Sequence, residues 1–285
     1  MQVDKETYLL LLLSDANLPT GSFVASAGLE STAAHALFHV PATPPGSDTL
    51  AFLRNSVDTY ARSTLPFARD AHRVTTAYAS GEMTELDEAL QALSRLDALY
   101  DASTLNHVAR RASCAQGAAL LTLYARGFTR PPFLMLKTPT TYLPLLDERE
   151  NRAGALVAAL KLRVRRGDSN APGHLPICWG VLAGALGLTV DRGAYIHLFL
   201  HARGVLSAAI RMNALGPYAA QQLLLHAVKH MVDDALTSTA HVVSGALQDE
   251  IDPEHAEDRL PATTWPLGDL LAARHDLLHS RIFNS

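Results

Sequence analysis

Apolar residues recur at helical spacing along almost the whole chain, and this pattern restricts the fold more than any other feature of the sequence. Two clear stripes of this kind are Leu86, Leu90, Leu93 and Tyr100, and Leu224, Val228, Met231 and Ala235. No window alternates between apolar and polar residues with a period of two, so β-strands are not expected. We therefore predict an all-α fold, in which residues 1–285 form a single helical-bundle-like domain of about ten helices.

Signals for helix ends agree with this pattern. Gly81 ends one predicted helix, and Thr84 begins the next in a capping-box-like start. Thr189 is the predicted N-cap of a helix over residues 190–212. Pro217 fits the first turn of a further helix, because proline lacks the N–H group that this turn leaves unpaired.

Segments rich in proline, glycine or polar residues interrupt the helices. They are the loops 41–47, 129–144 and 167–173, and the acidic stretch 248–261, which we expect to be mobile. A charged helix is predicted over residues 147–166, and we interpret residues 129–173 as an insertion into the helical domain. Because apolar helices stand on both sides of every loop, one domain with insertions is favoured over two domains.

Gly180 and Gly184 lie one helical turn apart in an apolar segment. Glycine lowers helix propensity by about 1 kcal/mol relative to alanine. Two glycines on one face therefore indicate that a neighbouring helix approaches closely, and we favour packing within the core over a contact between subunits.

The composition argues against several classes of protein. Acidic residues outnumber basic ones by 28 to 24, and the resulting net charge of −4 does not favour a nucleic-acid-binding protein.

The apolar run 8–13 follows charged residues and is read as a buried helix, not as a signal peptide. The longest uncharged stretch, 175–190, contains Pro176 and is shorter than the roughly 18 residues of a membrane span. Two cysteines, Cys114 and Cys178, cannot form a disulfide framework and indicate a reducing compartment. We therefore expect a cytoplasmic protein with no membrane partner.

Motifs for covalent chemistry are absent. The sequence has no GxxxxGK[ST] phosphate-binding loop, no GxGxxG after a strand and no GxSxG segment. Cys178 beside His174 is read as a buried thiol, because free cysteine is usually buried. No catalytic, cofactor-binding or metal-binding residue is predicted.

Histidine spacing leaves one enzymatic alternative open. Three pairs are spaced to share a helical face: His197 with His201, His226 with His230, and His275 with His279. Asp233 lies about one turn beyond the second pair and would complete the ligand set of a histidine-based metal-dependent hydrolase. Because none of the pairs carries the glutamate of HExxH, half-exposed helix histidines are the favoured interpretation.

A rigid turn follows the apolar N-terminal helix. Pro19 fixes φ and Gly21 permits a positive φ, so that the turn projects Thr20, Ser22 and Phe23. From residue chemistry alone, an ordinary corner between two helices is the simpler interpretation.

Five segments of the chain occur in an order that points to a known family. They are Leu11–Glu30, which contains LPTGSF and ends in GLE; Arg111–Gly117 (RASCAQG); Gly173–Gly180 (GHLPICWG); Leu206–Arg211 with Leu215–Gln221 (LSAAIR and LGPYAAQ); and Arg274–Ser285 (RHDLLHSRIFNS). Each segment is short, but together they resemble the UreF family of urease accessory proteins, in particular its plant and fungal members. Residues 129–173 lie outside the resemblance.

The resemblance implies a function in urease maturation. UreF proteins are all-helical, non-enzymatic chaperones that form dimers and bind UreD, which is also called UreH. The pair recruits the GTPase UreG and delivers nickel to the urease apoprotein, and modulation of GTP hydrolysis by UreG is one role proposed for the family. No cofactor of the chain itself is expected, because nickel is handled by the complex.

The resemblance also assigns surfaces to these partners. The UreD/UreH contact is expected in the tail of residues 280–285, on Arg281, Ile282, Phe283, Asn284 and Ser285. An aromatic residue and an arginine in this tail fit the assignment, since both are enriched at interfaces. The UreG-facing surface is expected at Pro19, Thr20, Gly21, Ser22, Phe23 and Glu30. The dimer contact is expected at Arg211, Gly216, Pro217 and Tyr218.

Overall fold

The computed structural model describes residues 4–15, 17–35, 46–131, 147–248 and 256–285. Its α-helices are α1 (Lys5–Leu13), α2 (Leu29–Ala34), α3 (Ser47–Ser80), α4 (Leu86–Ser103), α5 (His107–Leu123), α7 (Glu148–Arg166), α8 (Leu175–Leu186), α9 (Val190–Arg211), α10 (Pro217–Leu223), α11 (Lys229–Ser238), α12 (Ala256–Arg259) and α13 (Pro266–Ala273). Two π-helical turns, η2 (Tyr124–Phe128) and η3 (Leu224–Val228), and two 3-10 turns, η1 (Ser22–Val24) and η5 (Arg274–Leu277), complete them. The described ranges contain no strand, and the predicted all-α fold class is confirmed.

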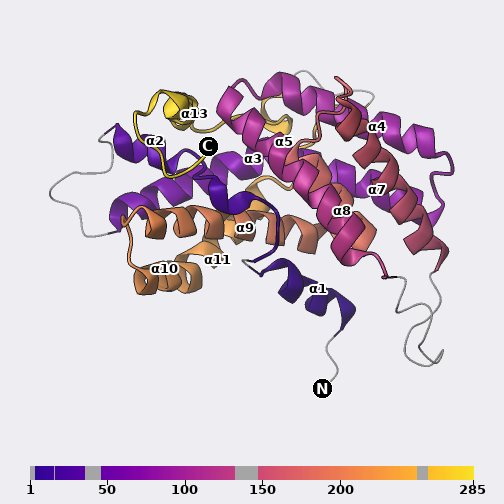
Figure 1. The fold of residues 1–285 in the computed structure, drawn as a ribbon, viewed down its shortest axis with the longest axis horizontal. Coiled ribbons are helices and arrows are strands. Elements are labelled where there is room, and N and C mark those ends of the chain that lie inside the picture. Colours follow the sequence, from indigo (N-terminus) through magenta and orange to yellow (C-terminus); the bar gives the residue numbers. More distant parts are fainter. Residues whose placement is uncertain (1–3, 16, 36–45, 132–146, 249–255) are drawn as a thin grey trace.

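The long helix α3 is the central helix, against which most of the other long helices pack. It spans 34 residues and contacts α4, α7, α8, α9 and α11. Figure 1 shows these helices gathered around it, with α2, α13 and the C-terminus together at one end of the molecule. Within the described ranges, none of the helices is both long enough and apolar enough to cross a membrane.

Two groups of buried apolar side chains fill the interior, and α3 contributes to both. In its C-terminal half, Phe67 and Val74 pack with α4, α5, α7 and α8. In its N-terminal half, Leu53 and Val57 pack with α2, α9, α10 and α11. The second group also contains Phe283, so the C-terminal tail is part of the core.

Helix ends follow the sequence signals with one exception. Gly81 ends α3 with a positive φ, the Thr189 hydroxyl caps α9, and Pro217 occupies the first turn of α10. The predicted N-cap at Thr84 is wrong, because α4 begins at Leu86 and has no side-chain cap. Arg152 of α7 binds the carbonyl oxygen of Thr84 at 3.2 Å, which holds this residue in the preceding loop.

The predicted charged helix of residues 147–166 is present as α7, with Asp147 as its N-cap. Three parts of the predicted loops, residues 41–45, 132–144 and 249–255, lie outside the described residues.

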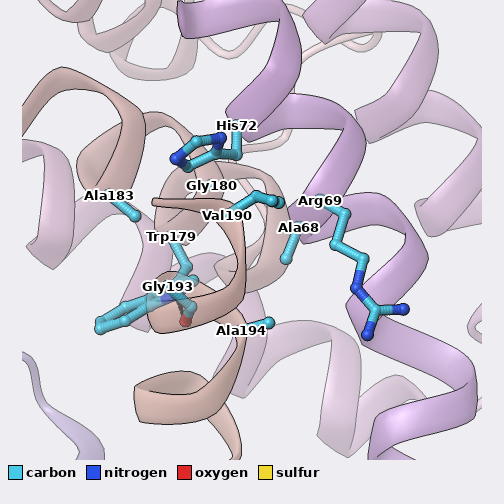
Figure 2. A pocket seen from close by; sticks show the side chains of 9 residues that line it. All are labelled: Ala68, Arg69, His72, Trp179, Gly180, Ala183, Val190, Gly193 and Ala194. Atoms are coloured by element: carbon cyan, nitrogen blue, oxygen red, sulfur yellow. Dashed lines mark hydrogen bonds between the residues drawn. The ribbon is translucent and has the colours of Figure 1, made fainter. Parts of the chain in front are cut away.

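Gly180 and Gly184 allow α8 to lie directly against α3, as the sequence predicts. A Cβ atom at Gly180 would collide with the carbonyl oxygen of Ala68, and one at Gly184 would lie 3.0 Å from Cβ of Thr75. Figure 2 shows the junction, where the remaining cavity of about 10 Å³ is about the size of one water molecule. The glycines therefore serve packing within the core.

Stacked rings join α3, α8 and α9 beside this junction. The rings of Trp179 and His197 lie 5.3 Å apart, and Tyr60 stacks on His201 at 3.8 Å. Nε2 of His201 shares a hydrogen bond with the hydroxyl of Ser56, whereas Nε2 of His197 has no hydrogen-bond partner among the described residues. Burial lowers the pKa of His197 to about 3 and that of His201 to about 4, so both rings are neutral at pH 7.

Gly180→Ala and Gly204→Ala form a matched pair that tests the helix contact. Both glycines lie inside helices, but a Cβ atom at Gly204 would meet nothing within 4 Å. We expect Gly180→Ala to lower the free energy of unfolding by about 1–3 kcal/mol through overpacking. Gly204→Ala should raise it by up to ~1 kcal/mol through better helix propensity. Urea denaturation followed by circular dichroism measures both, and equal effects would contradict the close contact.

The ring stack predicts a loss of stability in mild acid. Because the folded-state pKa of His197 lies below the unfolded value of 6.5, the unfolded chain takes up a proton first as the pH falls. The contribution of this residue is therefore complete above pH 6.5 and declines toward pH 3. Between pH 7 and pH 5 the loss should be about 2 kcal/mol for His197. The variant His197→Phe keeps a ring in the stack and should lose this part of the pH dependence. Denaturation curves at both pH values test it, and an unchanged difference would contradict the assignment.

Candidate partner-binding site

The turn after α1 has the geometry that its proline and glycine predict. Gly21 has a φ of +71° and is the N-cap of η1, and the hydroxyls of Thr20 and Ser22 lie 3.0 Å apart. Pro19 is exposed, and Phe23 leaves 65% of its surface accessible to solvent. The turn thus presents an aromatic ring and two hydroxyls outward.

Glu30 is a buried carboxylate in the first turn of α2, and it holds three groups from the end of the chain. It accepts hydrogen bonds from the backbone N–H of Ile282 at 2.5 Å and from that of Phe283 at 3.1 Å. Its other polar partner is Nε2 of His275 in η5, at 3.0 Å. Since a buried charge is costly unless it is hydrogen-bonded, Glu30 fixes the tail and η5 together on α2.

The tail from Arg281 to Ser285 bends at Ile282 and Phe283, and from Ile282 onward its residues alternate between exposed and buried. Phe283 is buried with 3% of its surface exposed, and Ser285 is buried as well. Ile282, which is 61% exposed, and Asn284 face outward. The backbone of the tail is joined to the N-terminal turn by two bonds, from Asn284 N–H to the Val24 carbonyl and from Ser26 N–H to the Ser285 carbonyl.

Arg211, at the end of α9, connects the turn with the tail. Its guanidinium group donates to the carbonyl oxygen of Phe23 and lies 4.3 Å from the ring centroid of Phe283. A cation over an aromatic face is attracted by the ring quadrupole, so this contact favours the docked tail. Gly216, Pro217 and Tyr218 follow at the start of α10 and are exposed, Tyr218 with 87% of its surface.

A second ionic group lies beside the tail around Asp276 of η5. Arg111 of α5 donates to both of its carboxylate oxygens, at 2.8 and 2.9 Å, and Arg281 donates to one of them at 3.0 Å. The imidazole of His107 lies 3.3 Å away. The hydrogen bond from Arg111 and the neighbouring positive charges hold the pKa of Asp276 well below its usual range.

Turn, tail and α5 enclose an open groove of about 660 Å³. Its lining residues are Gly21, Val24, Ala25, Arg111, Ala112, Ala115, Gln116, Arg281, Ile282, Phe283, Asn284 and Ser285. The lining thus combines small apolar side chains with two arginines and with the polar residues Gln116, Asn284 and Ser285.

The sequence analysis assigned the predicted residues to three separate surfaces, whereas the structure connects most of them. The tail, the turn, Glu30 and Arg211 form one connected unit, while Gly216–Tyr218 stay exposed at α10. Four residues of this unit, Ser26, Arg111, His275 and Asp276, were not predicted as site residues. Their partners are remote in sequence, and the spacing of one chain carries no signal for such contacts.

The three histidine pairs do not assemble a metal site among the described residues. No group of three potential ligands converges there. Asp233 instead accepts a hydrogen bond from Lys229 at 2.6 Å, and His226 lies in the π-helical turn η3. His275 binds Glu30, so these pairs give the hydrolase alternative no geometric support.

A row of Cys114, His174 and Asp101 has the residue types of a nucleophilic triad. Nε2 of His174 lies 2.9 Å from a carboxylate oxygen of Asp101, and Nδ1 lies 3.6 Å from Sγ of Cys114. Burial and the nearby carboxylates raise the pKa of Cys114 to about 11, so the thiolate that a cysteine nucleophile needs is not formed at neutral pH. Cys178 is fully buried, as predicted.

Comparison with known proteins identifies relatives along the whole chain. The family model named UreF matches residues 46–228. Urease accessory protein 6 of Cryptococcus neoformans var. grubii is 38% identical, over 99% of this chain and 98% of that protein. An uncharacterized urease accessory protein UreF-like of Schizosaccharomyces pombe is 29% identical over 98% of this chain and 97% of its own. Urease accessory protein F of Arabidopsis thaliana is 27% identical over 96% of this chain and 90% of that protein.

Glu30→Gln tests the hydrogen bonds by which Glu30 holds the tail. The neutral amide removes the charge and turns an N–H group toward the donors of the tail, so that Ile282 or Phe283 loses its acceptor. We expect the free energy of unfolding to fall by about 2–3 kcal/mol. The backbone amides of these two residues should also exchange hydrogen faster in native-state experiments. Glu88→Gln, at an exposed position of α4, is the matched control. Unchanged exchange in the tail of Glu30→Gln would contradict the assigned role.

Proposed function

The chain belongs to the UreF family of urease accessory proteins, and we propose that it promotes urease maturation as a non-enzymatic binding protein. In this proposal it binds UreD/UreH through the docked tail and recruits the GTPase UreG through the N-terminal turn. The assembly then supports nickel insertion into the urease apoprotein in the cytoplasm. The single observation that carries the proposal is the connected unit of turn, tail and Arg211, which presents exposed apolar side chains beside a groove.

The outward side chains of this unit suit a protein partner. Phe23 and Ile282 are large, apolar and exposed, while hydrogen bonds to Arg211 and Glu30, respectively, hold their backbone in place. Preorganised apolar anchors bind with a smaller loss of conformational entropy than mobile ones. The tail therefore offers Ile282 and Asn284 to UreD/UreH, while Phe283 secures the tail to the core.

The remaining elements of the proposal are the contact with UreG and the homodimer. The turn places Thr20, Ser22 and Phe23 for contact with UreG, and modulation of GTP hydrolysis follows if this contact positions groups at the UreG nucleotide site. Homodimer formation is proposed through the exposed start of α10, where Tyr218 supplies an aromatic side chain of the type enriched in interfaces. No cofactor is proposed for the chain, since nickel is the cargo of the complex.

Deletion of Arg281–Ser285 should abolish co-purification with UreD/UreH while the chain stays helical by circular dichroism. The deletion also exposes Glu30, so a milder variant is needed. Ile282→Ser keeps the backbone bonds of the tail and should weaken binding without changing the unfolding transition. Leu162→Ser, at an exposed position of α7, is its control.

A pull-down with UreD/UreH and UreG, followed by urease activation in cells that lack the gene, measures both variants. A deleted chain that captures UreD/UreH at wild-type yield would show that the tail does not bind this partner.

A further inference from the structure

None of the described residues fills the groove beside the tail. Phe283 packs in the core and Ile282 is largely exposed, and both line the groove together with residues of α5. On α5, Ala112 and Ala115 have short side chains, and an open space of about 660 Å³ remains between α5, the turn and the tail. A volume of this order is typical of pockets that enclose a ligand group.

The charged side chains among the lining residues of the groove are both arginines. Arg111 and Arg281 both face it, and the carboxylate that they share belongs to Asp276. His107 contacts the same carboxylate and Arg111 also donates to the carbonyl oxygen of Asn284. Each guanidinium has five N–H donors, and among the described contacts Arg281 uses only Nη1. The two arginines therefore retain donors for a second carboxylate.

We propose that this groove binds an acidic segment of the UreD/UreH partner, with an apolar side chain on Ala112 and Ala115 and a carboxylate on Arg111 and Arg281. The inference rests on the proposed function and specifies the chemistry of its partner. Charge complementarity selects the occupant, because two arginines that share one carboxylate attract an acidic group and repel a basic one.

In this arrangement the Asp276 carboxylate competes with the partner's carboxylate for the same two arginines. It occupies the donors of Arg111 and Arg281 in the free protein, and the partner's carboxylate has to share or displace it. Removal of this charge should strengthen binding. If Asp276 served only to hold the tail in place, its removal would weaken binding instead, so the sign of the effect separates the two roles.

The test measures binding of purified UreD/UreH to the full-length chain by titration. Asp276→Asn should bind about threefold to tenfold more tightly, and Arg111→Gln about tenfold more weakly. In the double variant the gain in affinity from Asp276→Asn should disappear, because the Arg111 guanidinium that would bind the partner's carboxylate is absent. Binding of the wild type should also weaken as salt is raised.

Matched variants separate the groove from the rest of α5. Arg110 is the neighbour of Arg111 but pairs with Asp101, so Arg110→Gln should leave binding unchanged. Ala115→Trp fills the groove without a change in charge and should block binding, whereas Ala109→Trp, exposed outside the groove, should not. Thermal unfolding of each variant confirms that it is folded.

The outcomes distinguish the two levels of the proposal. A wild-type chain that does not bind UreD/UreH overturns the proposed function. A wild type that binds, together with an Asp276→Asn variant that binds equally or less tightly, overturns the acidic-segment inference alone. Equal binding by Ala115→Trp and Ala109→Trp would likewise exclude the groove.

Discussion

One buried carboxylate, that of Glu30, decides how the two ends of this chain are arranged. Its oxygens accept hydrogen bonds from two tail amides and contact the imidazole of His275, across more than 240 residues of sequence. A carboxylate in this position would be strongly destabilising without these partners. The docked tail is therefore held by Glu30 and in turn supplies the donors that this buried carboxylate needs. The alternation of the tail follows directly, because the bonds to Glu30 and Ser26 fix the backbone so that Phe283 enters the core and Ile282 stays outside.

Local signals made much of the helical framework predictable. Caps such as Thr189 and Gly81, and the paired Gly180 and Gly184, act within a few residues or demand a close neighbour, so their effect can be read from sequence. Thr84 shows the limit of such rules. A guanidinium from α7 binds the carbonyl oxygens of Met83 and Thr84, and this tertiary contact overrides the local capping preference.

The candidate site was only partly predictable, for a related reason. The turn and the tail were assigned from motifs, and the structure describes both, but nothing in the sequence indicated that they contact each other. The interpretation of the paired histidines as half-exposed helix residues is wrong for His197 and His275, which are buried. His275 and His279 fit a metal pair by spacing, yet His275 is the partner of Glu30. His197 and His201 lie in a stack of rings, where burial keeps them neutral. A single sequence indicates which residues share a helical face, but not which residues pack against that face.

The region that matches the UreF family model, residues 46–228, supplies α3, α8 and α9, while the turn and the tail lie outside it. The framework and the proposed binding surface are nevertheless coupled, because Arg211 and Arg111 belong to the matched region and contact the turn and the tail. The proposed surface therefore depends on contacts with α5 and α9 as well as on the bonds between the turn and the tail. Because Asp276 contacts both Arg111 and Arg281, a single internal charge would set how strongly these arginines attract the proposed partner.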